Sequence, residues 1–336
     1  MNDQNLNENL GYKDSYRTHS AIANSDLRYL HSPKLFKAYK EGLIEKPEPK
    51  SYQEIGMLFE DFAFQLDNES FYNKYIVQPE HMSAPESKNQ KNFVYYIVIQ
   101  KTSVEEAYLN SFKVSESAQK TGKYKEKAQA LYNSLKDYIE FEKKAEEKKV
   151  ISAKDFNKIK QMFLNLAEDE AFKRMTEKAT EIKKSLVLGT EEPVTIFGIP
   201  WKGELDIVYL DHKDKIAYLC DIKTTSTPLG YFQYDIVRYK YYRQLALYRM
   251  LLQNHIGEEW TILTRIIAAE TTGMHETAVI PIPHDVLKKG EEELSEAADT
   301  IRWYRENGWE KRKSQVQNEG LLIYNWDELN MMKNED

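Results

Sequence analysis

Residues 203–225 read GELDIVYLDHKDKIAYLCDIKTT, and this stretch decides the fold. Two runs of strand character, GELDIVYL and KIAYLCDIKTT, flank a polar segment at 211–214 that is typical of a turn. We therefore expect the two runs to be antiparallel neighbours in one sheet. The first carries Asp206. The second carries Asp221 and Lys223, which are two residues apart and so project from one face of their strand.

Pairing of these strands would bring two carboxylates and one ammonium together. Converging carboxylates repel each other and need a divalent cation or a proton between them. Oxygen ligands without a thiolate suit Mg²⁺ or Mn²⁺. A lysine beside the cation can orient or deprotonate a water and offset negative charge on a phosphate. The alternative is a solvated strand end at which Asp221 and Lys223 form a weak exposed ion pair.

Length, charge and cysteine content set outer limits on the class of protein. The chain has 336 residues, enough for a large domain or two small ones, and a formal net charge of −7. That charge argues against coating nucleic acid by bulk attraction, but it leaves room for a local basic groove. The single cysteine, Cys220, excludes a disulfide framework and a cysteine-based zinc or iron–sulfur site.

The same features predict the protein's compartment. One cysteine is consistent with a reducing, cytoplasmic setting. The N-terminal segment is polar and lacks the apolar core of a secretory signal. No run of about 18 apolar residues exists, so we expect no membrane span.

The succession of helical and strand patterns predicts one α/β domain. Residues 1–17 indicate a disordered polar tail, and 18–336 a single domain with a Lys/Glu-rich helical insertion at about 101–185. Within that insertion, Ser152 and Asp155 resemble a capping box. Strands are predicted at 93–100, as a three-stranded meander within 193–225, at 260–270 and at 278–283; helices are predicted at about 234–254 and 285–307.

The helix at 234–254 carries a second group of candidate residues. Gln244 and Tyr248 are one turn apart and share a face. Basic and aromatic side chains alternate around them, namely Arg238, Lys240, Arg243 and Arg249 with Tyr239, Tyr241 and Tyr242. Such a mixture suits phosphate contacts and base stacking. The alternatives are a core aromatic for Tyr248 and an ordinary solvated face for part of the charges.

These motifs together resemble the PD-(D/E)XK nuclease core. GELDIVY followed by CDIKTT, and then QLALY as a Q-x-x-x-Y helix, match the branch that holds the RecB-type and exodeoxyribonuclease VIII-type nucleases. The segments ANSDLRYLHSPKLFKAYKEG, FYNKYIVQPE and VISAKDFNKIKQMFLNLAEDEAF extend the resemblance, which covers roughly residues 20–255 and is closest to the exodeoxyribonuclease VIII-like phage and prophage exonucleases. It implies an α/β, restriction-endonuclease-like core, with a mixed central sheet flanked by helices in αβββαβ order.

The resemblance also implies roles for individual residues. Asp206, Asp221 and the main-chain carbonyl of Ile222 would bind one or two Mg²⁺ or Mn²⁺ ions, and Lys223 would act on the attacking water. Gln244 and Tyr248 would contact the substrate or brace the lysine. Further substrate contacts are expected from Thr224, Arg238 and Arg243.

One position departs from the pattern of this group. Its first core helix often carries a histidine in a G-x-x-x-H motif, but here the helix reads GMLFE, with Glu60 at the histidine position. Other branches, including the lambda-type exonucleases, carry a glutamate there. Glu60 would therefore complete the metal site and take part in catalysis. The alternative is a solvent-facing glutamate.

The function implied is that of a metal-dependent exonuclease acting on duplex DNA ends. The family pairs such enzymes with a single-strand annealing protein in phage recombination, and ring-shaped homo-oligomers occur among relatives. A Cas4-like or helicase-associated nuclease is a second hypothesis, which the single cysteine disfavours because those proteins commonly carry four. A DNA-binding descendant without catalysis is a third.

Overall fold

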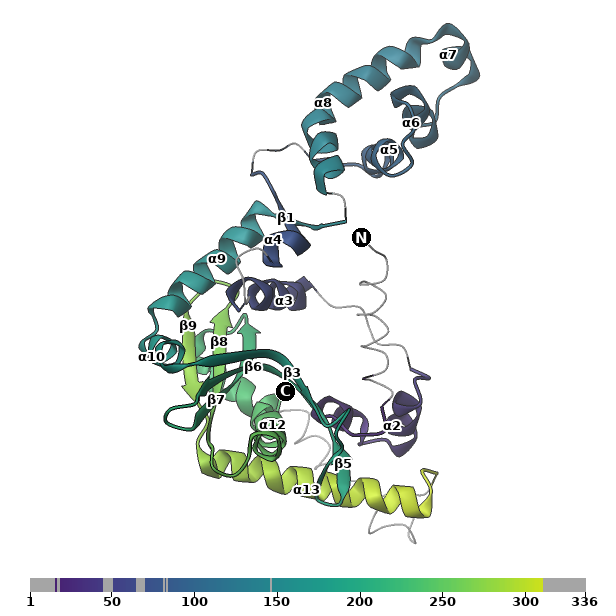
Figure 1. Cartoon of the computed structure of the whole chain (residues 1–336). Helices are drawn as coiled ribbons and strands as arrows, with labels where there is room; N and C mark the ends of the chain where they lie inside the picture. Colours follow the sequence, from purple (N-terminus) through teal and green to yellow (C-terminus); the bar gives the residue numbers. More distant parts are fainter. Residues whose placement is uncertain are drawn as a thin grey trace, which may run out of the picture. The chain divides into compact units, whose positions relative to one another are not determined.

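The computed structural model describes residues 16, 19–44, 51–64, 70–80, 82, 84–145 and 147–310 (Figure 1). The chain divides into two compact units. The core unit comprises Met1–Lys50 and Leu166–Asp336, and the inserted unit comprises Ser51–Asn165. Apart from Tyr16, the expected tail at 1–17 lies outside the described residues, and the division into a tail and a single domain stays a prediction.

A five-stranded mixed sheet forms the centre of the core unit. Its order is β3-β6-β7-β8-β9, with bounds β3 Glu181–Leu188, β6 Gly203–Asp211, β7 Ile216–Thr225, β8 Thr261–Glu270 and β9 Thr277–Pro281. β6 and β7 are antiparallel through the predicted turn, whereas β7 and β8 are parallel. Parallel neighbours need a crossover connection, which α11 (Phe232–Arg238) and α12 (Tyr241–Ile256) provide here. The predicted mixed α/β architecture is confirmed.

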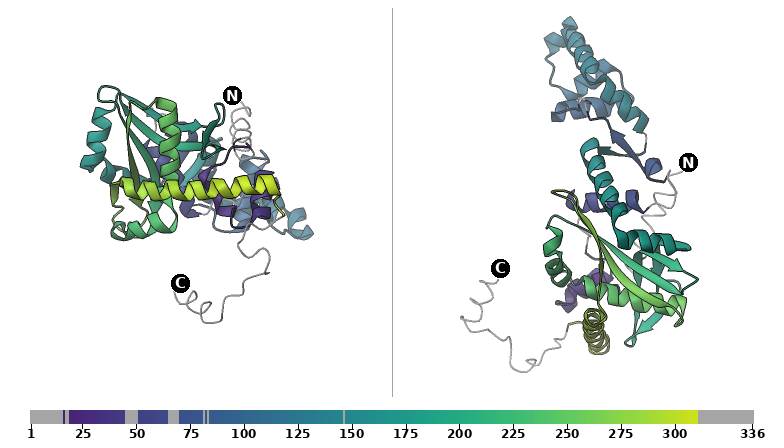
Figure 2. Two further views of the ribbon diagram at one scale, coloured as in Figure 1. Left: turned by 90° about the horizontal axis from the view of Figure 1, so that it is seen from below. Right: turned by 90° about the vertical axis from the view of Figure 1, so that its left-hand side faces the viewer.

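Helices cover both faces of this sheet. α12 packs on one face, and α13 (His284–Asn307) lies across α12 on the side away from the strands (Figures 1 and 2). α10 (Glu170–Lys178) contacts β6 from the other face, where the ring of Phe172 meets that of Tyr209. A layered arrangement of this kind buries the apolar side of each helix against the strands.

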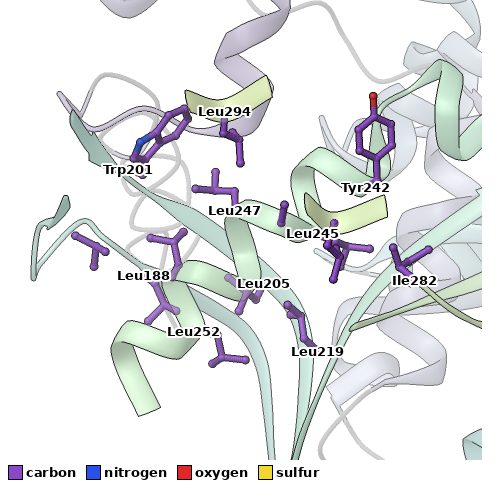
Figure 3. Packing of buried hydrophobic residues seen from close by; sticks show 14 of the residues in the cluster. Leu188, Trp201, Leu205, Leu219, Tyr242, Leu245, Leu247, Leu252, Ile282 and Leu294 are labelled. Carbon is purple, nitrogen blue, oxygen red and sulfur yellow. The ribbon is translucent and has the colours of Figure 1, made fainter. Parts of the chain in front are cut away.

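The main apolar cluster lies between the sheet, α12 and α13. Figure 3 shows part of its packing, including Leu205, Leu219, Leu245, Leu247 and Leu252. Each buried leucine contributes roughly 1.5–3 kcal/mol relative to exposure, so this cluster fixes α12 on β6 and β7. The position of α12 matters because Gln244 and Tyr248 lie on it.

Two predicted elements of the core unit are wrong in detail. The first strand of the sheet is β3, which the sequence assigned to the end of a helical insertion at about 101–185. Three of its first four residues, Glu181, Lys183 and Lys184, are charged and partly exposed because β3 lies at the edge of the sheet. Part of the predicted meander is a separate hairpin of β4 (Val194–Ile196) and β5 (Ile199–Trp201), which turns at Phe197 and Gly198, both with positive φ.

The predicted continuous helix at 234–254 is also interrupted. α11 and α12 are separated at Tyr239 and Lys240, and Lys240 has a left-handed backbone with φ of 56°. The sequence YKYY contains neither glycine nor proline, so it carries no ordinary signal for a break. The strand at 260–270, the strand at 278–283 and the helix at 285–307 are confirmed as β8, β9 and α13.

Shorter elements complete the core unit. They are η1 (Asn24–Tyr29), α2 (Pro33–Lys40) and η2 (Leu229–Tyr231). Ile22 forms a bridge with Trp201 and thereby ties the segment before η1 to the hairpin of β4 and β5. Among the described residues, no helix combines the length and the apolar character that crossing a membrane requires.

The inserted unit is mainly helical. Its elements are α3 (Ser51–Ala63), α4 (Ser70–Lys74), β1 (Tyr75–Gln78), α5 (Lys88–Val98), α6 (Val104–Ser111), α7 (Glu116–Thr121), α8 (Lys123–Ala145), β2 (Lys149–Ser152) and most of α9 (Ala153–Glu168). β1 and β2 pair in parallel. The amide of Asp155 donates to Ser152 Oγ at 3.0 Å, which confirms the predicted cap of α9.

The strand predicted at 93–100 is wrong, because this segment belongs to helix α5. A capping box begins the helix, with Gln90 N donating to Ser87 Oγ and Ser87 N to Gln90 Oε1. Phe93, Val94 and Ile97 then form one buried stripe at helical spacing. Because residues 93–100 are rich in β-branched and aromatic side chains, which favour strands, the sequence predicts a strand where the apolar residues in fact follow the helical period.

The contact between α12 and α13 generates a stability prediction. A Cβ at Gly290 would lie 2.8 Å from the carbonyl oxygen of Tyr242 and 2.9 Å from Ala246 Cβ. Gly290→Ala should therefore lower the free energy of unfolding by about 1–3 kcal/mol, although alanine favours helix by about 1 kcal/mol. Urea denaturation measures this change. Gly230→Ala is the control, since nothing lies within 4 Å of its Cβ, and equal effects of the two substitutions would contradict the prediction.

Candidate active site

Two carboxylates meet where β6 and β7 lie side by side. The antiparallel register pairs Ile207 with Cys220, so the next step along the strands places Asp206 opposite Asp221. Asp206 Oδ2 accepts a hydrogen bond of 2.7 Å from the amide of Ile222. This bond stands where the next backbone hydrogen bond between β6 and β7 would otherwise form. The predicted convergence of the two aspartates on one face is therefore present.

Asp221 is completely buried and is held from two sides. Its Oδ1 accepts a hydrogen bond of 3.0 Å from Gln244 Nε2. Lys223 Nζ lies 2.6 Å from Oδ2, which is ion-pair distance but without the angles of a hydrogen bond, so Oδ2 has no hydrogen-bond donor among the described residues. A buried carboxylate oxygen in this state is poorly stabilised.

The electrostatics of the pair follow from this burial. Burial raises the pKa of Asp221 to about 7; the Lys223 ammonium acts against this rise, and the neighbouring Asp206 adds a smaller rise of its own. Burial opposes the charge on Lys223, but Asp221 and Asp206 together raise the pKa of its ammonium above the ordinary value. Lys223 is therefore a cation in this state, with 19% of its side chain exposed.

Gln244 and Tyr248 connect α12 to the carboxylates. Gln244 Nε2 donates to Asp221 Oδ1 and to the hydroxyl of Tyr248, each at 3.0 Å. Burial, together with the negative charge of Asp206 and Asp221, raises the pKa of Tyr248, so its hydroxyl keeps its proton. The predicted helical pair thus contacts the site, but Gln244 braces Asp221 rather than Lys223.

A glycine makes this approach possible. A Cβ at Gly203 would lie 2.8 Å from Tyr248 Cε1 and 2.9 Å from Leu251 Cδ1. Any larger residue at the start of β6 would push α12 away from the strand. This requirement explains the glycine of the GELD motif and gives it a structural part in the site.

Tyr241, which the sequence analysis named only as one of several aromatic residues on this helix, is a direct neighbour of Lys223. Its ring centroid lies 5.2 Å from Lys223 Nζ and within stacking distance, 6.1 Å, of the ring of Phe232. Cation–π contacts of this kind stabilise a charged lysine by about 0.5–2 kcal/mol. In the sequence, Tyr241 stands three residues before Gln244, a spacing that places both side chains on the same turn of α12.

Most of the predicted basic contacts are engaged within the protein. Arg243 donates from Nε to Asn24 Oδ1 at 2.9 Å and lies 3.6 Å from a Glu293 carboxylate oxygen. Lys240 pairs with Glu293, and Arg249 pairs with Glu291. These acidic partners lie on α13, about fifty residues further along the chain. Arg238 alone of the four forms no ion pair with a residue that the structure describes.

One further predicted residue, Thr224, lies away from this cluster. Thr224 follows Lys223 on β7, so strand alternation directs its side chain to the opposite face. Thr225 shares the face of Lys223, and its hydroxyl donates to Asp235 Oδ2 at 3.1 Å. Glu60 lies on α3 of the inserted unit, and its part in a metal site stays a prediction.

The donors at this site fit a hard divalent cation. Among the described residues, no group of three or more His, Cys, Asp and Glu side chains is arranged around a common metal position. Asp206 and Asp221 nevertheless supply two adjoining carboxylates, one with an oxygen that lacks a hydrogen-bond donor. Oxygen donors of this kind are those that Mg²⁺ and Mn²⁺ prefer.

Fold and site together define a class of protein. A mixed sheet with paired aspartates on adjacent strands, followed by Lys223 two residues after the second, is the arrangement of a PD-(D/E)XK nuclease domain with a restriction-endonuclease-like fold. The family model described as "PDDEXK-like domain of unknown function (DUF3799)" matches residues 28–315, and the chain belongs to this family. Nucleases of this kind generally use divalent metal ions.

Comparison with solved structures also finds similar chains. The chain is similar to a crystal structure described as "Putative exonuclease" from Eubacterium rectale, with 14% identity and a TM-score of 0.35. The alignment covers 72% of this chain and 88% of that chain. No curated protein matches the chain.

The raised pKa of Asp221 generates a prediction for the metal-free protein. A carboxylate with a pKa near 4 when unfolded and about 7 when folded stabilises the fold least when it is ionised. The stability of the wild type relative to Asp221→Asn should therefore fall as the pH rises from about 4 to about 7, by more than about 1.4 kcal/mol, the equivalent of one pKa unit.

Urea denaturation in EDTA across this pH range measures the difference. A constant offset between the two proteins is expected from the altered ion pair with Lys223 and does not affect the slope. A difference that stays flat with pH would show that Asp221 titrates normally.

Proposed function

We propose that this chain is a divalent-metal-dependent deoxyribonuclease that hydrolyses phosphodiester bonds from duplex DNA ends. The observation that supports it most is the meeting of Asp206 and Asp221 beside Lys223. A carboxylate buried with a raised pKa and a charged neighbour is costly for stability, which favours a functional rather than a structural origin.

The carboxylates would hold the cation. Asp206, Asp221 and the main-chain carbonyl of Ile222 would be its ligands in the core unit, and Glu60 would add a carboxylate from α3. A bound Mg²⁺ or Mn²⁺ supplies Lewis-acid stabilisation of the charge that develops on the scissile phosphate. One or two such ions are consistent with this ligand set.

The remaining residues position the reacting groups. Lys223, charged and partly exposed, would orient the attacking water and offset negative charge on the phosphate. Gln244 fixes the rotamer of Asp221, and Tyr248 keeps its proton and so remains a hydrogen-bond donor. Both residues are supports that hold the metal ligands in place.

The finer assignment rests on the sequence motifs. Their resemblance to the exodeoxyribonuclease VIII-like branch supports action on DNA ends, in the cytoplasm, in recombination of the phage type. A single-strand annealing protein would then be the partner that receives the product. A homo-oligomer is part of the same proposal.

The cleavage prediction compares linear with closed-circular duplex DNA. With Mg²⁺ or Mn²⁺, the wild type should release nucleotides from linear DNA only, and EDTA should abolish release. Asp221→Ala should lower the rate at least about 100-fold, since it removes a metal ligand, and Gln244→Ala should lower it about 10- to 100-fold. Release of labelled nucleotides over time is the measurement.

A matched control is available on the same sheet. Asp211 is also a buried aspartate at the end of β6, but it caps the turn through Lys213 N and Asp214 N. Asp211→Asn should cleave at the wild-type rate. Cutting of closed circles would replace the exonuclease with an endonuclease, and DNA binding without cleavage under any divalent ion would replace it with a binding protein.

Metal binding should also be measurable without DNA. A cation that binds only the folded state raises stability, and Tm rises about 2–4 °C for each kcal/mol in a domain of roughly 150–250 residues and less in a larger one. Millimolar Mn²⁺ should raise the Tm of the wild type and leave that of Asp221→Ala unchanged. An equal shift in both proteins would mean that the ion binds elsewhere.

A further inference from the structure

An exposed aromatic surface lies beside the carboxylate site. Tyr231, Tyr234, Val237 and Tyr239 form what we call the tyrosine face, on η2, α11 and the residue that follows α11. Their exposed fractions are 61%, 65%, 66% and 55%. None of the three tyrosine hydroxyls forms a hydrogen bond with a residue that the structure describes, so hydrogen bonding within the described protein does not account for their presence at the surface.

The opposite side of α11 packs in the hydrophobic core. Phe232 and Ile236 are 1% and 9% exposed and anchor the helix in the core cluster. A short surface helix of this kind ordinarily presents charged residues to solvent. Its outward side carries large apolar and aromatic groups beside Gln233 and Arg238, and such a mixture is typical of an interaction surface.

The rings continue from the tyrosine face into the site. The ring centroids of Tyr239 and Tyr241 are 5.6 Å apart, and that of Tyr241 is 5.2 Å from Lys223 Nζ. Lys223 in turn pairs with Asp221. A ligand that lies on this face therefore extends directly toward the carboxylates.

Hydrogen bonds from the strand ends fix α11 in place. The amide of Leu229 donates to Glu270 Oε1 at 2.7 Å, at the end of β8. Thr225 Oγ1, at the end of β7, donates to Asp235 Oδ2 at 3.1 Å within α11. The face is thus held in a set position before a ligand arrives, which lowers the entropy cost of binding.

The charge at the face indicates the kind of ligand. The guanidinium of Arg238 lies 5.6 Å from the ring of Tyr239 and forms no ion pair with a described residue. Aromatic rings beside an available arginine suit bases and phosphates of a single strand, since each unpaired base offers a π-face. Bases inside a duplex are stacked on one another and cannot offer theirs.

We infer that the tyrosine face stacks the unpaired bases of the DNA strand that reaches the Asp206–Asp221 site. This inference rests on the proposed function, because that function makes DNA the substrate. It adds that the strand is separated from its complement next to the site, and that the face binds its bases rather than its phosphates alone.

The test measures binding in EDTA, where no cleavage occurs. Fluorescence anisotropy compares a single strand of about 15 nucleotides with an abasic strand of the same length and charge. Tyr234→Ala/Tyr239→Ala should weaken binding of the normal strand at least about 10-fold and that of the abasic strand less than about twofold. Tyr234→Phe/Tyr239→Phe should bind as the wild type does, because the rings remain.

Controls separate stacking from other effects. Tyr95→Ala removes a comparably exposed tyrosine, 47%, from α5 of the inserted unit and should not change either affinity. Unchanged binding of the normal strand by the double alanine variant, equal weakening on both strands, or a wild type that does not prefer the normal strand would each overturn the inference. A face that serves a protein partner would give the first of these results.

The outcome is independent of catalysis. Thermal unfolding of each variant confirms that the fold is intact. If the wild type cleaves no DNA with any divalent ion, the proposed nuclease activity fails while the binding comparison can still be made. If cleavage proceeds and the double variant binds normally, the inference fails alone.

Discussion

The antiparallel pairing of β6 with β7 is the constraint on which the rest of this structure depends. It places Asp206 and Asp221 side by side in a buried position; burial raises the pKa of Asp221, Asp206 adds a smaller rise, and both carboxylates raise the pKa of Lys223. Every other group at the site responds to the charge of these carboxylates. Gln244 donates a hydrogen bond to Asp221, Tyr248 keeps its proton because of its burial and of the carboxylate charge, and the ring of Tyr241 lies beside the lysine that balances that charge.

The hydrophobic core serves this pairing. α12 must lie close enough to β6 for Gln244 to reach Asp221, and the leucines of the main cluster together with the bare backbone of Gly203 allow that distance. α13 then holds α12 from outside, through close contact at Gly290 and through the ion pairs of Glu293 and Glu291. Helix α12 therefore contributes both to the stability of the core unit and to the geometry of the site.

Local pattern was enough to predict the centre of the site. Asp206, Asp221 and Lys223 were identified because strand alternation fixes their faces, and Gln244 with Tyr248 because the helical period does. The pattern failed where a distant partner decides the outcome. Arg243 was predicted to contact phosphate, but in the structure it pairs with Glu293, which lies fifty residues later in the chain. β3 was missed because an edge strand exposes polar residues, and the break at Lys240 because it depends on a single backbone angle.

The parallel pairing of β1 with β2 has a further consequence for the chain's architecture. It joins Tyr75–Gln78 to Lys149–Ser152, so the chain leaves this two-stranded sheet after Gln78 at one end and re-enters it at Lys149 at the other, as a crossover connection. Helices α5, α6 and α8, between the two strands, share a separate apolar cluster around Phe93 and Ile139. The segment between β1 and β2 therefore has an apolar core of its own, separate from the cluster that packs against the five-stranded sheet.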